Sequence, residues 1–293
     1  MVTVLTTESG GPAAVGLIKS LRVLGDAVHI VATDASPLAP GLYLADHKEV
    51  VPYADDPAYI GSLLKVVEKY KVNFILPTGE HDLQALAQNK ELFERAGCTV
   101  FISSHETINT CQDKFKFYQA LKDTEIPVPA TFNVPMIIKP VRGSGSRGIK
   151  VLPLKEEIIQ EYIPGTEYTV DVFCDMSSQI INHVIRERVA IKAGISTQGR
   201  TVRHPVVSKI VTDMVEHLQL KGPLCIQLRE NSTGNPVVIE CNPRLGGGTY
   251  MCTLAGVNYG SLYYNLYKGL DLDSFETPPK KITVVRYFEE IVL

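Results

Sequence analysis

The most informative part of the chain is residues 222–248, which read GPLCIQLRENSTGNPVVIECNPRLGGG. Two apolar segments, 224–229 and 237–242, flank a cluster of residues that favour turns, Asn-Ser-Thr-Gly-Asn-Pro. This pattern predicts a β-hairpin. If Glu230 pairs with Val237, then Gln227 faces Glu240 and Cys225 faces Asn242 across the hairpin.

The predicted hairpin gathers oxygen-bearing side chains on one face. Because side chains alternate along a strand, Gln227, Glu240 and Asn242 share a face, and the opposite face is apolar: Ile226, Leu228 and Ile239. Oxygen ligands suit Mg²⁺, which completes its coordination with substrate phosphates and water. An ordinary hairpin with a polar outer face is the alternative. Glu-x-Asn-Pro-Arg244 followed by three glycines argues against it, because glycine loses the most backbone entropy on ordering.

A second segment, residues 136–151, reads MIIKPVRGSGSRGIKV and predicts a strand, a glycine loop and another strand. The loop contains GxGxxG, but a dinucleotide fingerprint must lead into a helix, and here a strand resumes. It is not a Walker A loop, because Ile149 follows Gly148 where lysine is required. Backbone N–H groups around Ser144 and Gly145 can cover phosphates, with Lys139 adding a point charge. A plain flexible hairpin fits the segment equally well.

The third segment, residues 158–173, is an apolar run that passes through Pro-Gly into an alternating strand. This pattern predicts a hinge. Its backbone at Glu161, Tyr162 and Ile163 could contact an adenine edge, and Glu167 could accept hydrogen bonds from ribose hydroxyls. Taken alone, the segment fits a simple connecting loop better.

The first 110 residues alternate predicted strands and helices, which predicts a parallel sheet with helices on both faces. The expected elements are 2–6, 13–24, 27–34, 60–70, 74–77, 82–96 and 99–103, with a helix from Asn109 towards Pro129 as the junction. Ser9-Gly-Gly-Pro12 after the first strand fits an anion site or a tight turn. Glu80 and His81 fit a substrate contact, although a helix N-cap cluster is the simpler interpretation.

Composition agrees with a cytoplasmic enzyme. The chain has 293 residues, 45% hydrophobic and 21% charged, enough for one or two cores. A net charge of −3 gives no general basic footprint, so we expect no nucleic-acid partner. No apolar run could span a bilayer and no signal peptide is recognisable, so no membrane partner is expected. The six cysteines lack CxxC spacing, which favours buried thiols over zinc or disulfides.

The order and wording of these segments resemble the ATP-grasp superfamily, especially the carbamoyl phosphate synthase large subunit and small stand-alone carboxylate-amine ligases. The resemblance covers roughly residues 1 to 265 and begins its ATP-grasp part at Asp113-Lys114. It implies that Lys114 and Lys139 hold phosphates, with Ser144 and Gly145 in the lid. It also implies roles for the remaining segments: the adenine hinge at Glu161, Tyr162 and Ile163, the ribose acid Glu167, the metal ligands Gln227, Glu240 and Asn242, and the anion-binding Arg244.

The resemblance implies an α/β fold with a Rossmann-like domain over 1–110 and an α+β ATP-grasp domain over 111–293. The lid subdomain, about 125–165, is short for the family, which indicates either a reduced lid or segments absent from the chain. Residues 185–204 are rich in cations and fit a solvated loop. Within an ATP-grasp fold, Arg188 and Lys192 would neutralise a carboxylate or the transferring phosphoryl group.

The implied activity is ATP- and Mg²⁺-dependent ligation of a small-molecule carboxylate to an amine or ammonia through an acyl phosphate, with Mn²⁺ as an alternative metal. Arg244, Lys139 and Arg188 are the expected catalytic residues, and a homodimer is left open. A nucleotide-binding regulator or pseudoenzyme of the same fold is the alternative. An NAD-dependent oxidoreductase is disfavoured, because the first strand is not followed by a complete dinucleotide fingerprint.

Overall fold

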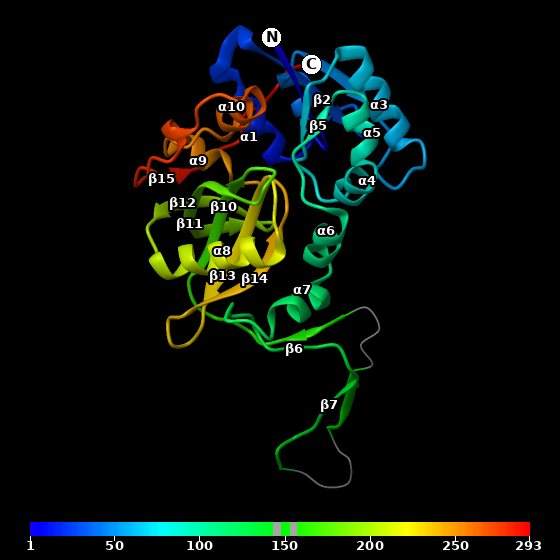
Figure 1. The fold of residues 1–293 in the computed structure, drawn as a ribbon. Helices are drawn as coiled ribbons and strands as arrows, with labels where there is room; N and C mark the ends of the chain where they lie inside the picture. The colour runs from blue at the N-terminus through cyan, green and yellow to red at the C-terminus, as the bar shows by residue number, and fades with distance from the viewer. Residues whose placement is uncertain (143–147, 153–156) are drawn as a thin grey trace.

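A computed structural model describes residues 1–142, 148–152 and 157–293 of the protein. Ser144 and Gly145 of the predicted lid therefore lie outside the described residues. The chain combines an N-terminal parallel sheet, a C-terminal antiparallel sheet and a group of C-terminal helices that lies between them (Figure 1). The predicted α/β fold class, with an α+β C-terminal part, is confirmed.

The N-terminal sheet has the strand order β3-β2-β1-β4-β5, and all neighbouring pairs are parallel. Its central strands β1, β2 and β4 are largely buried, as is usual for parallel sheets that are covered on both faces. The short strand β3 was not predicted. The strands are β1 Val2–Thr6, β2 Val28–Asp34, β3 His47–Val50, β4 Phe74–Leu76 and β5 Thr99–Val100.

Several predicted helices are shorter or divided. The helix predicted for 13–24 ends at Leu21 and continues as a 3-10 helix, Arg22–Ala27, in which Gly25 takes a φ of +54°. The helix predicted for 82–96 is broken at Asn89, and the junction helix is two helices with Asp113 as the N-cap of the second. The helices are α1 Pro12–Leu21, α2 Gly41–Leu44, α3 Tyr59–Tyr70, α4 Leu83–Gln88, α5 Lys90–Arg95, α6 His105–Gln112 and α7 Lys114–Leu121.

The C-terminal sheet has the order β14-β13-β10-β11-β12-β15, and every neighbouring pair is antiparallel. Helix α8, Pro205–Leu218, packs against one face. The strands are β10 Glu167–Cys174, β11 Ile180–Lys192, β12 Ile195–Val202, β13 Pro223–Glu230, β14 Pro236–Asn242 and β15 Thr283–Val285.

The loop predicted for 185–204 was wrong, because most of this segment forms the hairpin of β11 and β12. Its turn consists of Ala193 and Gly194, with φ values of +48° and +74°. Two consecutive residues with positive φ make the kind of tight turn whose twist matches paired strands. The cationic side chains therefore stand on an ordered sheet.

Two small two-stranded sheets connect the halves of the chain. Strand β6, Thr131–Phe132, pairs with β9, Ile159–Gln160, and β7, Met136–Ile138, pairs with β8, Lys150–Leu152. The predicted strands on both sides of the glycine loop are thus confirmed. The hairpin of β7 and β8 projects away from the rest of the molecule (Figure 1). The described residues of 125–165 form strands and connections without a helix.

Three large hydrophobic cores hold the described structure together. One lies on one face of the parallel sheet, and another lies between the antiparallel sheet and α6, α7 and α8. The third is shared: Val4 and Phe74 of the parallel sheet pack with Phe173 of β10 and with Tyr259 of α10. The C-terminal helices α9, Tyr250–Leu254, and α10, Tyr259–Lys268, therefore close onto the N-terminal sheet. A domain boundary at residue 110 stays a prediction.

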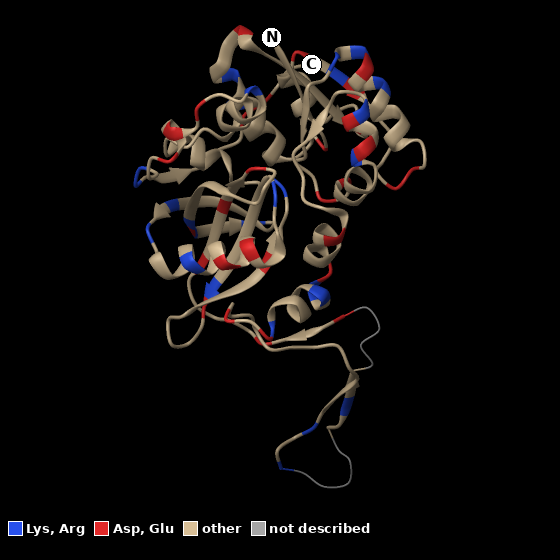
Figure 2. Cartoon of the chain, in the orientation of Figure 1, with Lys and Arg blue, Asp and Glu red and all other residues tan. Residues whose placement is uncertain are grey.

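The charges on the described surface are mixed, and the cysteines are buried as expected. Acidic and basic residues are interspersed along α3 and α5 (Figure 2), where Glu91 pairs with Arg95 and Lys90 with Glu94. All six cysteines are buried and free. No helix in the described ranges has both the length and the apolar character that a membrane span requires.

Candidate functional site

The hairpin of β13 and β14 brings the predicted ligand residues together. Gln227 pairs with Glu240 and Cys225 with Asn242, as the sequence predicts. The pairing of Glu230 was wrong: it faces Pro236 rather than Val237, because a β-bulge separates the pairs of Gln227 and Leu228. An extra residue in one strand reverses the side-chain alternation beyond it.

Because of the bulge, the predicted composition of the apolar face was wrong at one residue. Val238, rather than Ile239, faces Leu228 and joins Ile226 in the core beneath the sheet. Ile239 is only partly buried. The bulge thus keeps an apolar core under the hairpin while Glu240 stays on the polar face.

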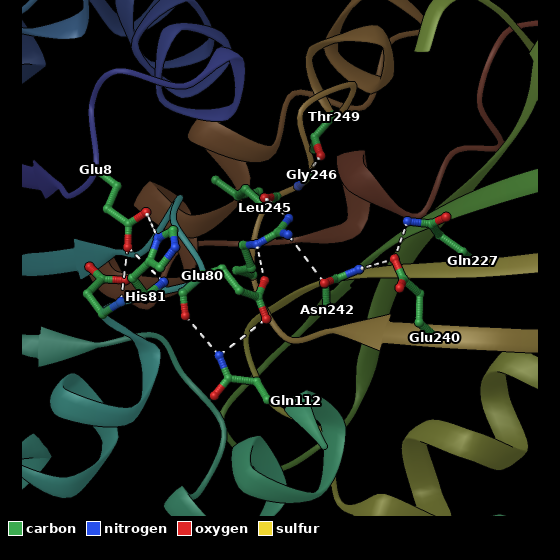
Figure 3. A network of polar contacts seen from close by, with 12 residues as sticks. Glu8, Glu80, His81, Gln112, Gln227, Glu240, Asn242, Leu245, Gly246 and Thr249 are labelled. Atoms are coloured by element: carbon green, nitrogen blue, oxygen red, sulfur yellow. Dashed lines mark hydrogen bonds and ion pairs between the residues drawn. The ribbon is translucent and has the colours of Figure 1, made fainter. Parts of the chain in front are cut away.

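Three polar side chains converge on this face (Figure 3). The Gln227 amide donates from Nε2 to Oε1 of Glu240 at 2.5 Å, and the Asn242 amide donates from Nδ2 to the same oxygen at 3.0 Å. Their metal-binding role stays a prediction.

The donor set fits a divalent cation that binds oxygen. A half-turn of each amide would present its oxygen beside Glu240, at the cost of the hydrogen bonds that these oxygens now accept from Arg188 and Arg244. Within the described ranges, no group of three or more His, Cys, Asp or Glu residues is arranged to hold a metal. One carboxylate with two amides suits Mg²⁺ that is bound largely through substrate phosphates.

Arg244 ties this hairpin to the N-terminal sheet. Its Nε donates to Oε2 of Glu80 at 2.8 Å, and its Nη2 donates to Oδ1 of Asn242 at 3.3 Å. Gln112 holds Glu80 in turn, donating to the Glu80 backbone carbonyl at 2.8 Å (Figure 3). Glu80 is not an N-cap, because α4 begins at Leu83. The predicted site therefore extends to the carboxyl edge of the parallel sheet.

Beside this contact, Glu8 organises the loop after β4. Its Oε1 accepts the backbone N–H groups of His81 and Asp82 at 2.9 and 3.0 Å, and this hydrogen-bonded carboxylate raises the pKa of His81. The Glu8 side chain lies so close to the backbone of residue 79 that only glycine fits there, since a Cβ would lie 1.8 Å from the Glu8 carboxyl carbon. His81 itself points into solvent, with its side chain 85% exposed.

Arg188 is also at the site. Its Nη1 donates to Glu167 Oε1 at 2.6 Å and to Gln227 Oε1 at 2.8 Å, and its Nη2 donates to the Gly194 carbonyl at 2.5 Å. The predicted ribose acid Glu167 thus contacts the basic strand. Lys192 lies elsewhere, with its Nζ 5.7 Å from the Phe288 ring centroid.

The predicted phosphate lysines and the hinge residues make no hydrogen bond to Gln227, Glu240 or Asn242 within the described ranges, although the hinge contacts the hairpin at Arg229. Lys114 and Lys139 are exposed, and Lys139 directly follows β7 on the loop side of the projecting hairpin. In the hinge, the Glu161 backbone N–H donates to the Ala130 carbonyl at 2.8 Å, Tyr162 is exposed under Arg229, and Ile163 is buried. Their nucleotide-binding roles stay predictions.

A pocket of about 240 Å³ opens beside Gln227, Glu240, Asn242, Arg188 and Arg244. Its lining also includes residues that the sequence did not single out as site residues, among them Arg186 and Ser196. Alternation along β11 places Arg186 on the same face as Arg188, and this period-two signal could have identified it.

Comparisons with known proteins agree with the fold. The family described as ATP-grasp in the biosynthetic pathway with Ter operon matches residues 154–291, and the PylC-like N-terminal domain matches residues 11–101. The carbamoyl phosphate synthase large chain of Methanothermobacter thermautotrophicus is 23% identical over 90% of this chain. The chain spans only 29% of that relative's length.

Solved structures extend the comparison. An ADP complex of N5-carboxyaminoimidazole ribonucleotide synthetase is 16% identical with a TM-score of 0.70, and the match covers 97% of this chain and 81% of that one. The L-amino acid ligase from Bacillus licheniformis gives a TM-score of 0.68 at 17% identity, over 97% and 78% of the two chains. The C-terminal half of the chain thus matches an ATP-grasp family model, and the whole chain shares the fold of these solved structures. The proteins compared are named as a synthase, a synthetase and a ligase.

Proposed function

We propose that the protein is an ATP-dependent ligase that joins a carboxylate to an amine or ammonia through an acyl phosphate, releasing ADP and phosphate. The observation that carries this proposal is the convergence of Gln227, Glu240 and Asn242 on one face of the hairpin, with Arg244 bonded to Asn242. The L-amino acid ligase likeness supports the same reaction class.

Each residue has a separate task in the proposed reaction. Gln227, Glu240 and Asn242 would hold Mg²⁺, which supplies charge neutralisation at the β and γ phosphates of ATP. Arg188 and Arg244 would face the oxygens on which negative charge develops. Phosphoryl transfer requires mainly positioning and charge stabilisation, so no nucleophilic side chain is needed.

The substrate carboxylate would attack the γ-phosphorus of ATP, expelling ADP and forming the acyl phosphate. The amine then attacks the acyl carbon, and phosphate leaves with one of the original carboxylate oxygens. Lys114, Lys139 and the hinge at Glu161, Tyr162 and Ile163 would contact the nucleotide, and Glu167 its ribose.

Glu240→Gln tests the metal site. We expect loss of phosphate release from MgATP or MnATP, measured across a panel of acids and amines, with unchanged thermal unfolding. Glu68→Gln, on the exposed face of α3, is the matched control and should behave as wild type. Near wild-type turnover in folded Glu240→Gln would contradict the metal assignment.

Isotope transfer tests the reaction order. Oxygen-18 in the substrate carboxylate should appear in the released phosphate, and ADP should be the nucleotide product. AMP with pyrophosphate, or unlabelled phosphate, would exclude the acyl phosphate. ATP binding without turnover on any acid would instead favour a nucleotide-binding regulator.

A further inference from the structure

A row of four residues crosses the polar face of the antiparallel sheet. Glu240 pairs with Gln227, Gln227 with Thr169, and Thr169 with Arg186. Neighbouring strands lie about 4.8 Å apart, so the ends of this row are separated by about 14 Å between Cα atoms. Both end residues line the same pocket. The pocket therefore reaches from the proposed metal residues to a guanidinium on β11.

Arg186 is buried, and Asp171 holds one edge of its guanidinium. Its Nε donates to Oδ2 of Asp171 at 2.5 Å, and Asp171 also accepts from Oγ1 of Thr249 at 2.5 Å and from Sγ of Cys252 at 3.2 Å. Burial opposes the guanidinium charge, but the carboxylate of Asp171 raises the pKa of Arg186, which stays ionised.

The other edge of this guanidinium has no oxygen acceptor among the described residues. Nη1 has only a contact with Met251 Sδ at 3.9 Å, and Nη2 makes no hydrogen bond within the described ranges. Gly248 lies against this edge, since a Cβ at 248 would fall 2.6 Å from Nη1. Two strong donors thus remain beside the pocket wall, and a desolvated charged donor without an acceptor is costly.

Two further polar side chains lie around this pocket. Ser196 is 4% exposed and lines the pocket, yet its Oγ has no hydrogen-bond partner in the described structure. Arg286 approaches from the C-terminal segment and donates from Nη1 to the Gly247 carbonyl at 2.8 Å. Burial and the positive charge of Arg186 lower the pKa of Arg286, so the local field is cationic.

We propose that Arg186 and Ser196 form a subsite for a second anionic group, a carboxylate, on one of the two substrates. This inference rests on the proposed ligase function and narrows it: one substrate carries a carboxylate that does not react. A pocket of about 240 Å³ accommodates only a small molecule, since sites for drug-sized ligands occupy roughly 300–1,000 Å³.

The second carboxylate could belong to either substrate. It is one end of a dicarboxylate whose other end is phosphorylated, or it is the α-carboxylate of an amino acid that serves as the amine. Turnover of matched substrate pairs separates these sources. For a dicarboxylate, succinate is compared with its half-amide, with ammonium as the amine. For an amino acid, glycine is compared with glycinamide, with a monocarboxylate as the acid.

Two substitutions block the subsite without removing a buried charge. Ser196→Ala removes the free hydroxyl, and Gly248→Ala places a methyl group against Arg186 at a position without positive φ. Their matched controls are Ser232→Ala in the β13–β14 turn and Gly61→Ala in α3, where a Cβ meets nothing within 4 Å.

The kinetic result expected is a KM for the carboxylate-bearing substrate that rises at least about tenfold in both variants. The KM for ATP should change less than about twofold. We also expect wild type to prefer the carboxylate over its amide in one of the two pairs. Equal use of acid and amide, or unchanged KM in both variants, would overturn the subsite.

A binding measurement keeps this inference separate from the proposed function. Crystals soaked in bromide should show anomalous scattering beside the Arg186 η nitrogens in wild type and none there in Gly248→Ala. Bromide in this place without turnover on any substrate would refute the ligase and retain the anion subsite. Absence of bromide from wild type, or an equal peak in Gly248→Ala, would refute the subsite.

Discussion

At the residue scale, Arg244 joins two regions that are distant in the chain. It donates to Asn242 on its own hairpin and to Glu80 on the edge of the parallel sheet. Both partners hold its guanidinium in one orientation beside the pocket. A preoriented charge stabilises a transition state without costly reorganisation during the reaction.

Arg244→Ala should therefore slow phosphoryl transfer far more than it weakens ATP binding. We expect kcat to fall by roughly 10²–10³, the cost typical of losing one such donor. Single-turnover ADP formation and calorimetry with MgATP measure the two effects. Arg95→Ala on the exposed face of α5 is the control. A loss confined to ATP affinity would contradict the assigned role.

Asp82 is a second residue with an unusual environment. It is completely buried, and burial followed by the negative charge of Glu8 raises its pKa to about 7. The unfolded chain releases this proton at a lower pH than the folded protein. Stability from this group is therefore full below about pH 4 and falls as the pH rises towards 7.

Asp82→Asn should remove this pH dependence. Relative to wild type, the variant should gain stability between about pH 4 and 7, by up to a few kcal/mol, because one pKa unit corresponds to about 1.4 kcal/mol. Urea unfolding at a series of pH values measures the difference. A constant difference between the two proteins across this range would show that Asp82 does not titrate as described.

At the element scale, turns and a bulge decide which side chains reach the site. The bulge in β14 keeps Glu240 beside Gln227, and the Ala193–Gly194 turn pairs β11 with β12. The Gly194 carbonyl also receives Arg188. Local backbone conformation thus fixes the positions of Glu240 and Arg188.

Gly194→Ala should destabilise the protein by about 1–2 kcal/mol, because residues other than glycine resist positive φ. A Cβ at 194 meets nothing within 4 Å, so the cost is one of backbone conformation. Gly61→Ala in helix α3 should instead stabilise by about 0.5–1 kcal/mol. Chemical denaturation compares the pair, and effects of the same sign would contradict this account.

At the scale of the whole molecule, the two sheets share a core. Phe173 of β10 stacks on Tyr259 of α10 at 5.7 Å between ring centroids, and both pack with Phe74 of the parallel sheet. Apolar contacts of this kind couple the unfolding of the parts that make them. We expect the N-terminal and C-terminal regions to unfold together.

Cysteine labelling tests this coupling. All six thiols are buried, and burial raises the pKa of Cys98 and Cys225 to about 12, which suppresses the reactive thiolate. We expect no labelling by iodoacetamide in native protein at neutral pH. Cys98 and Cys241, in different cores, should become reactive at the same urea concentration. Exposure of one well before the other would show independent domains.

The sequence by itself determined the elements whose causes are local. The pairing of Gln227 with Glu240 follows from strand alternation and a short turn, and the parallel sheet follows from alternating strands and helices. The same alternation would have revealed that Arg186 and Arg188 share a face. The register error at Glu230 arose because a bulge adds one residue without an obvious mark in the sequence.

Only the tertiary structure decided which distant residues meet. Glu80 and Arg244 are 164 residues apart, and Asp171 and Thr249 are 78 apart, yet each pair is hydrogen-bonded. No local pattern encodes these contacts, because they depend on how the C-terminal helices pack against the parallel sheet. The hairpin with its oxygen-bearing side chains could therefore be predicted from sequence. The surroundings of Arg186 could not, because they arise where the antiparallel sheet meets the loop at Gly248 and helix α9.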